Sequence, residues 1–216
     1  MKQRFVVPIV VASLLAVALP VLAAPVPFTI DPTHSQVSFA IRHFFTRVYG
    51  RFNDFSGSIM LDEQNLANSS VEATIQAASI FTANEKRDKH LRSADFFAVD
   101  SIPTITFKST KVSGTQGGKL TIEGNLTVRG VTRPVVLEGT MLGAGALDVT
   151  GSYSAGYRAG FEATTTINRK DFNVTWNRTL DQGGTMLGDD VVITVGVEAI
   201  REEPKKAATA PASQKK

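Results

Sequence analysis

Apolar and polar side chains alternate along residues 120–128, which is the pattern of a strand with one buried face. A turn follows at residues 129–130, and the alternation resumes over residues 135–137. The two strands of such a hairpin share a face on which Gly124 and Gly139 stand where bulky side chains are expected. Glycine within a strand marks a bulge, a bend, or close approach by a ligand or another backbone. The hairpin therefore predicts a sheet with a hollow on its buried face.

The same alternation recurs through most of the chain, in short segments separated by Gly, Asn, Asp and Pro. Short strands at near-regular spacing are typical of an antiparallel barrel or sandwich. The expected strands are residues 28–30, 37–41, 52–61, 71–77, 105–107 and onward, the two arms of the hairpin, 147–153, 160–167 and 191–200.

Residues 82–97 lack this alternation and are rich in charge. Thr82 or Asn84 can cap a helix, with an acidic residue following at its positive end and basic residues near its last turn. Ser93 or Asp95 can begin a second short turn. A helix beside a barrel would lie over an opening or seal a flank.

Both ends of the chain differ in composition from the strand-rich part. Residues 1–23 begin with basic side chains, continue with an apolar run and end on small residues, which predicts a secretory signal peptide cleaved after Ala23. An uncleaved membrane anchor is the alternative, but the run has only about 18 residues and contains two prolines. Residues 202–216 carry too few apolar side chains to fold, which predicts a solvated tail. A single domain at residues 24–201 remains.

The basic character of the chain comes from its ends. There are 23 Lys and Arg residues against 20 Asp and Glu, but six of the bases and two of the acids lie in residues 1–23 and 202–216. The domain between them is near neutral, so nucleic-acid binding loses its main support. Cysteine is absent, which excludes thiol catalysis and Cys-ligated metals. Burial of apolar surface must therefore stabilise the fold without disulfides.

Six segments resemble the YceI-like family of secreted bacterial proteins, which are often described as polyisoprenoid-binding. They cover nearly all of the domain in the family's order. Asn173 stands where the family commonly has Gly, although Asn tolerates left-handed backbone. The basic, alanine-rich tail is not a family feature. The matching segments are 34–52 (HSQVSFAIRHFFTRVYGRF), 87–97 (RDKHLRSADFF), 103–110 (PTITFKST), 120–137 (LTIEGNLTVRGVTRPVVL), 159–174 (AGFEATTTINRKDFNV) and 187–199 (LGDDVVITVGVEA).

The resemblance implies a mainly β fold, an eight-stranded antiparallel barrel similar to lipocalins, with one or two short helices packed against it. It also implies that some members hold a long isoprenoid chain, such as a quinone tail, inside the barrel. Other members look like binders of different long-chain amphiphiles.

Thirteen phenylalanines, against three tyrosines and one tryptophan, supply aromatic surface without a polar group. An eight-stranded barrel is just wide enough to fill itself with side chains or to hold one small ligand. The pattern leaves both outcomes open, and the resemblance favours the cavity. Strand parity then predicts, as ligand-binding residues, Phe39, Ile41, Phe52, Phe97, Ile105, Phe107, Ile122, Leu126, Leu137, Phe161, Ile167, Phe172 and Trp176, with Gly124 and Gly139 as spaces between them.

The remaining polar groups favour structural roles over catalysis. The three histidines, His34, His43 and His90, lack the close spacing of zinc ligands, and no carboxylate cluster is expected to accompany His34 or His43, so structural or rim positions are favoured. Ser93 lacks the G-x-S-x-G turn of a hydrolase nucleophile and is better suited to capping a turn.

A second group of charges and aromatics lies at residues 168–172 and 176–178. It suits either a barrel rim that contacts a head group or a partner, or a loop fixed by local Asp–Arg pairing. Trp176 is the residue expected to make the contact.

A soluble periplasmic protein that sequesters or carries a long-chain isoprenoid or similar lipid, and is not an enzyme, is the expected function. No metal or cofactor is required, and a polyisoprenoid or an isoprenoid quinone is the expected class of bound molecule. Transient contact with a membrane or membrane protein and a homodimer are both compatible with the sequence. The alternatives are a quinone-dependent redox accessory and a stress-response protein without a bound ligand.

Overall fold

The computed structural model describes residues 24–115, 117–147, 156–181 and 183–203. Within these ranges, strands dominate and a single α-helix is present. The strands are β1 (Val26–Ile30), β2 (Gln36–His43), β3 (Thr46–Phe52), β4 (Phe55–Leu61), β5 (Ser70–Gln76), β6 (Ile80–Phe81), β7 (Thr104–Gly114), β8 (Lys119–Val128), β9 (Val131–Leu147), β10 (Gly156–Asn168) and β11 (Leu187–Arg201). The helix is α1 (Glu85–Arg92), and short 3₁₀ turns lie at η1 (Leu66–Asn68), η2 (Ala77–Ser79) and η3 (Arg169–Phe172).

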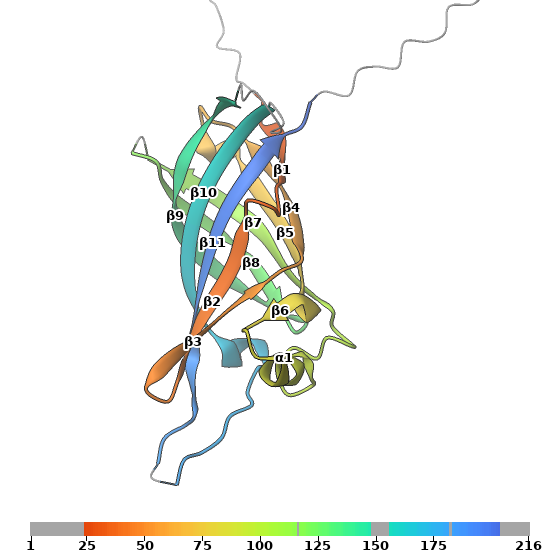
Figure 1. The fold of residues 1–216 in the computed structure, drawn as a ribbon. Helices are drawn as coiled ribbons and strands as arrows, with labels where there is room; N and C mark the ends of the chain where they lie inside the picture. Colours follow the sequence, from red (N-terminus) through yellow and green to blue (C-terminus); the bar gives the residue numbers. More distant parts are fainter. Residues whose placement is uncertain (1–23, 116, 148–155, 182, 204–216) are drawn as a thin grey trace, which may run out of the picture.

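Eight of the strands close into an antiparallel barrel in the order β1-β4-β5-β7-β8-β9-β10-β11 (Figure 1). The barrel closes because β11 pairs with β1 as well as with β10. The predicted fold class, a lipocalin-like eight-stranded barrel with a helix beside it, is confirmed. In the described ranges, no helix has both the length and the apolar character needed to cross a bilayer.

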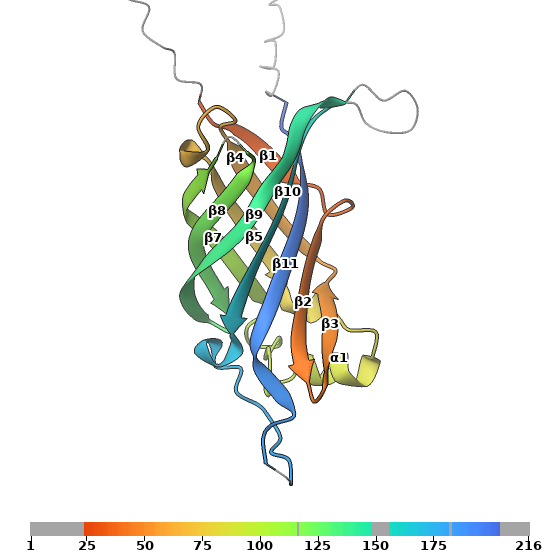
Figure 2. The ribbon, with the colours of Figure 1, turned by 90° about the vertical axis from the view of Figure 1, so that its left-hand side faces the viewer.

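Strand β11 changes its second partner along its length. Residues 199–201 pair with β1, whereas residues 191–196 pair with β2. Strands β2, β3 and β6 therefore continue the sheet beyond the point of closure. They lie with α1 at one end of the barrel, while β1 lies toward the other end (Figures 1 and 2).

The β8–β9 hairpin has the predicted turn. Val128 pairs with Val131, and both residues between them have positive φ, 50° and 71°, as in a type I′ turn. The first of these is Arg129, whose guanidinium reaches the segments that follow α1 and η3. It donates to the carbonyl oxygens of Ala94, Phe96 and Asn173 at 2.8, 3.1 and 2.8 Å.

The helix prediction is also confirmed, with Asn84 as its N-cap. The Asn84 side chain accepts from the backbone N–H of Arg87 at 3.0 Å. Arg92, at the other end, donates to the carbonyl oxygens of Ala78 and Ile80. These bonds fasten α1 to β6 and the turn before it.

The predicted strand over residues 52–61 is wrong in its bounds. Phe52 ends β3 and Phe55 begins β4, so a turn separates two strands where one was expected, and β3 itself was not predicted. The cause is the composition of β3, where large polar residues face solvent and Gly50 occupies an inward position beneath the Phe39 ring. Most of the expected strand at 147–153, the signal peptide at 1–23 and nearly all of the expected tail lie outside the described residues.

Buried apolar side chains form two clusters toward the two ends of the barrel. Phe28, Leu61 and Ala199 belong to the cluster where β1, β4 and β11 meet. Phe52 and Phe172 belong to the cluster near β6 and η3. A cavity extends along the barrel between these clusters and is bordered by both.

A candidate ligand cavity inside the barrel

The cavity has a volume of about 860 Å³ and a predominantly apolar wall. Pockets for small organic ligands span about 300–1,000 Å³, so this one lies near the upper end of that range. Its wall consists of inward-facing residues from the barrel strands and from β2 and β3, completed by α1 and the segment after η3. The barrel interior is therefore only partly filled by its own side chains.

All thirteen bulky residues predicted from strand parity border this cavity. Alternation places the ten strand residues there, because every second residue of a strand faces the same side. Phe97, Phe172 and Trp176 lie outside the strands and reach the cavity from the segment after α1, from η3 and from the segment after η3. The thirteen residues are Phe39, Ile41, Phe52, Phe97, Ile105, Phe107, Ile122, Leu126, Leu137, Phe161, Ile167, Phe172 and Trp176. Their contact with a ligand stays a prediction.

The two glycines do not border the cavity, and the hollow expected at them is absent. A Cβ at Gly124 would overlap the Phe107 ring and lie 2.7 Å from the carbonyl oxygen of Lys108. A Cβ at Gly139 would overlap the carbonyl oxygen of Glu162 on β10. Each glycine instead allows a neighbouring strand or ring to approach closely, which is the other role of glycine in sheets.

Charged and polar side chains line the helix end of the cavity, and sequence reasoning did not identify Asn84, Lys86 or Arg87 as cavity residues. Strand parity says nothing about a helix, and charged helical residues are ordinarily solvated. The expectation that this helix lies over a barrel opening was the one signal that could have indicated these residues. The polar lining residues at this end include His43, Asn84, Lys86, Arg87 and His90.

An aromatic cluster borders the same end. The His90 ring packs edge-on against Phe96 and Trp176, with ring centroids 5.1 and 4.8 Å away. His90 Nε2 lies 2.8 Å from Asp95 Oδ2. The Ser93 hydroxyl donates to the backbone carbonyl of His90, so it caps the helix as expected and does not face the imidazole as a nucleophile would.

Arg169 fixes the segment that carries Trp176. Its guanidinium is buried and donates to the carbonyl oxygens of Val174 and Trp176 at 2.7 and 2.8 Å. It also donates to the backbone of Gly188 and pairs with Asp189 at 3.2 Å. Burial lowers the pKa of Arg169, and the Asp189 carboxylate partly opposes that effect. Hydrogen bonds from Arg169 to its carbonyl oxygens therefore hold the loop, and the carboxylate that pairs with Arg169 comes from β11 and not from the loop itself. Trp176 borders the cavity from this loop.

Arg169→Lys is expected to lower the free energy of unfolding by about 1–2 kcal/mol, because lysine cannot reproduce the planar fork that serves several carbonyls. Urea denaturation followed by circular dichroism measures this change. The control is Arg178→Lys, since the Arg178 side chain is exposed. Equal stability of both variants would contradict the structural role of Arg169.

Residues 28–199 match the family model for the YceI-like domain. The chain belongs to the YceI-like family. A UPF0312 protein of Pectobacterium atrosepticum is 39% identical over 204 residues, which are 94% of this chain and 100% of that protein.

Solved structures similar to this YceI-like chain share its barrel. BcnA of Burkholderia cenocepacia has a TM-score of 0.68 and 24% identity, over 78% of this chain and 98% of that one. A polyisoprenoid binding domain from Saccharophagus degradans has a TM-score of 0.59 and 14% identity, over 82% and 99% of the two chains. The resemblance inferred from the sequence is thus confirmed at the level of family and fold.

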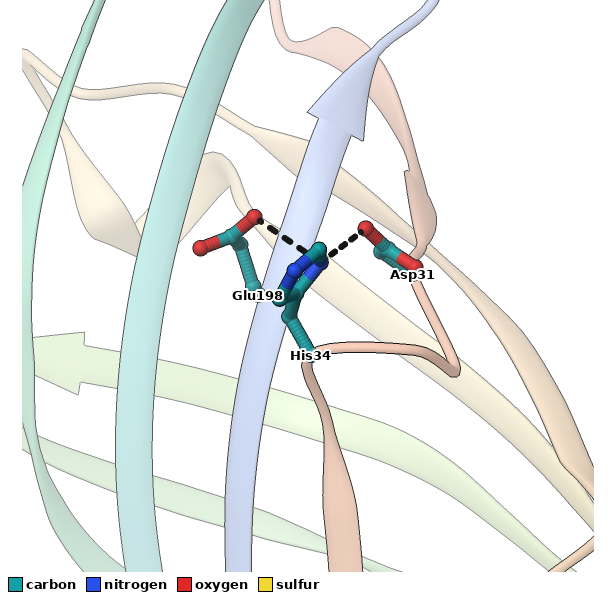
Figure 3. Close-up of side chains that lie close together, drawn as sticks. All are labelled: Asp31, His34 and Glu198. Carbon is teal, nitrogen blue, oxygen red and sulfur yellow. Dashed lines mark hydrogen bonds and ion pairs between the residues drawn. The ribbon is translucent and has the colours of Figure 1, made fainter. Parts of the chain in front are cut away.

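A cluster of ionisable side chains lies outside the cavity, where the backbone passes from β1 to β2 (Figure 3). His34 Nδ1 is 2.8 Å from Asp31 Oδ2 and 3.8 Å from Glu198 Oε1. The expectation that no carboxylate cluster accompanies His34 is therefore wrong, because pairing of distant strands brings Glu198 beside it. Arg158 forms ion pairs with both carboxylates. Arg158 thus supplies positive charge to this cluster, which joins β10 and β11 to the segment that follows β1.

Acid is expected to weaken this junction. The hydrogen bond with His34, aided by Arg158, lowers the pKa of Asp31 to about 2. A carboxyl whose pKa is lower in the folded state stabilises the fold above its unfolded value of about 3.9, and that stabilisation is lost as pH falls toward 2. Asp31→Asn should therefore reduce the free energy of unfolding by about 1–2 kcal/mol at pH 7, with the difference from wild type disappearing near pH 2. Urea titrations at several pH values test this, with exposed Asp100→Asn as control; a pH-independent difference would contradict it.

Proposed function

We propose that this YceI-like protein is a periplasmic binding protein that sequesters or carries a long-chain isoprenoid or similar amphiphilic lipid. The single observation that carries the proposal is the apolar cavity of about 860 Å³ along the barrel, with His43, Lys86 and His90 among the residues that line its helix end. The apolar tail occupies the barrel, and the head group lies near His43, Lys86 and His90. A solved structure with a similar barrel, described as a polyisoprenoid binding domain, supports the ligand class. The signal-peptide pattern at residues 1–23 supports the location.

Burial alone supplies enough free energy for such a ligand. Each buried methylene contributes about 0.8 kcal/mol, so ten of them give about 8 kcal/mol before the losses of chain and overall motion are subtracted. No specific polar contact is needed for affinity. A site of this kind therefore consists of many apolar residues and few hydrogen-bonding ones, as the cavity wall does.

Mass spectrometry of the protein recovered from the periplasm tests the proposal. Expression of the full sequence should yield a chain beginning at Ala24, and solvent extraction should release a long-chain lipid in near-stoichiometric amount. The protein stripped of lipid should take up an isoprenoid quinone or a fatty amide. A protein that is recovered empty and stays empty when offered both would contradict lipid binding, and recovery in the cytoplasmic fraction would contradict the location.

A redox accessory is the second candidate, and one observation favours it. His43 and His90 border the polar end of the cavity, where a quinone head group would lie. Quinone turnover in the presence of an electron donor, lost in His43→Gln or His90→Gln while quinone binding is retained, would favour this function over simple sequestration.

A further inference from the structure

The β2–β3 hairpin ends in two exposed phenylalanines. Phe45 is fully exposed, at 105% of the reference value, so its ring contacts nothing in the described chain. Phe44 has a φ of 50°, a conformation rare for a bulky side chain. Its N–H donates to the Met186 carbonyl at 3.0 Å, and its own carbonyl accepts from Arg42 at 3.1 Å. The tip is therefore held in a strained turn that presents Phe45 to solvent.

The outer face of this hairpin is basic. Arg42 and Arg47 pair directly across the two strands, an arrangement in which like charges repel. Arg51 lies on the same face as Arg47, with Tyr49, 70% exposed, between them. Within the described residues, none of the three arginines forms an ion pair with a carboxylate. The hairpin thus combines a strained turn, two arginines that face each other and a fully exposed phenylalanine ring. Each of these features lowers local stability, and features of this kind are expected at functional sites.

The other face of the same hairpin belongs to the cavity. His43 and Val48 line it, as does Met186, the residue whose backbone holds the tip. Helix α1, which contributes Lys86 to the lining, lies at the same end of the barrel (Figure 1). The exposed aromatic tip and the basic face therefore flank the polar end of the cavity.

We propose that the β2–β3 hairpin docks the protein on the surface of an anionic lipid bilayer. Phe45 enters the interfacial region, where aromatic side chains are favoured, and the arginines contact lipid phosphates. Each basic residue near such a surface strengthens binding about fivefold. A single projecting ring between arginines suits a bilayer better than a protein partner, because specific protein interfaces need about 1,000 Å² or more of complementary surface. Docking here would bring the polar end of the cavity to the bilayer. The biological role of this docking therefore rests on the proposed lipid-binding function.

Vesicle flotation tests the docking directly. The chain beginning at residue 24 is suitable, since β1 starts at Val26 and the described barrel closes without the preceding residues. It should bind vesicles of phosphatidylcholine with 30% phosphatidylglycerol and bind pure phosphatidylcholine at least about tenfold more weakly. Phe45→Ser should weaken binding to the anionic vesicles about tenfold. Leu142→Ser, which removes another exposed apolar side chain from β9, is the matched control and should have no effect.

A second pair of variants tests how much the basic side chains of the hairpin contribute to vesicle binding. Arg47→Gln should weaken binding to anionic vesicles about fivefold, whereas Lys119→Gln, at an exposed position on β8, should leave it unchanged. Equal effects of each variant and its control would overturn the assignment to this hairpin. A concentration-dependent dimer that is lost in Phe45→Ser, without vesicle binding by wild type, would also overturn it and identify the hairpin as a self-association surface.

Binding of farnesol, an isoprenoid alcohol added from ethanol without vesicles, separates this inference from the proposed function. Wild type and Phe45→Ser should bind farnesol equally if docking alone is lost. Farnesol binding without vesicle binding would overturn the docking and leave the lipid-binding function standing. Specific vesicle binding by the hairpin, with neither farnesol nor a longer isoprenoid entering the cavity, would support the docking while contradicting the proposed function.

Discussion

Gly139→Ala is expected to lower the free energy of unfolding by about 3 kcal/mol. The added methyl group would overlap the Glu162 carbonyl oxygen and lie 2.7 Å from the Ala163 Cβ. Both neighbours belong to β10, whose residues 162–164 pair with β9 around this position. A backbone oxygen in a hydrogen-bonded ladder cannot turn aside as a flexible side chain can. Relief therefore requires the two strands to separate, with loss of pairing on that side of the barrel.

Gly145→Ala is the matched control, since it lies on the same strand and a Cβ there has no neighbour within 4 Å. Its stability should remain within about 0.5 kcal/mol of wild type, or rise slightly because alanine restricts the unfolded chain. Urea denaturation of both variants measures the difference. A Gly139→Ala protein as stable as Gly145→Ala would show that space does exist at Gly139, as the sequence pattern had indicated.

The inward-facing set of residues could be predicted because its cause is local. A strand alternates its side chains with a period of two, and a two-residue turn fixes the pairing of its neighbour. The turn after Val128 therefore aligns Ile122 with Leu137, and both border the cavity. The same local rule placed the residues of the other strands, although it could not show whether the space between them was filled.

The glycines were misinterpreted because their neighbours are distant in sequence. Gly124 is covered by Phe107 from β7, and Gly139 is approached by Glu162 from β10. Periodicity within one hairpin contains no information about how closely the flanking strands approach. The ion-pair cluster was missed for the same reason, since His34 meets Glu198 only after β11 closes the barrel.

Val195→Trp is expected to reduce lipid occupancy at least about tenfold. Val195 lies mid-way along β11, between the cavity-lining residues Val37 and Ala163 on the adjacent strands. An indole at this position would project across a barrel that is only wide enough for one slender ligand. Excluding as few as two methylene groups from burial removes about 1.6 kcal/mol, which corresponds to more than a tenfold loss of affinity. Co-purified lipid and farnesol titration both measure the effect.

Thr194→Trp is the control, because Thr194 is exposed on the outer face of the same strand and the residue gains similar bulk there. Its lipid occupancy should equal that of wild type. The free energy of unfolding of Val195→Trp distinguishes an open cavity from a packed core. In an open cavity the indole at position 195 is accommodated and folding is retained, whereas overpacking a filled core costs about 1–3 kcal/mol. A destabilised Val195→Trp protein with unchanged lipid content would therefore show that the barrel is a packed core and that any lipid binds elsewhere.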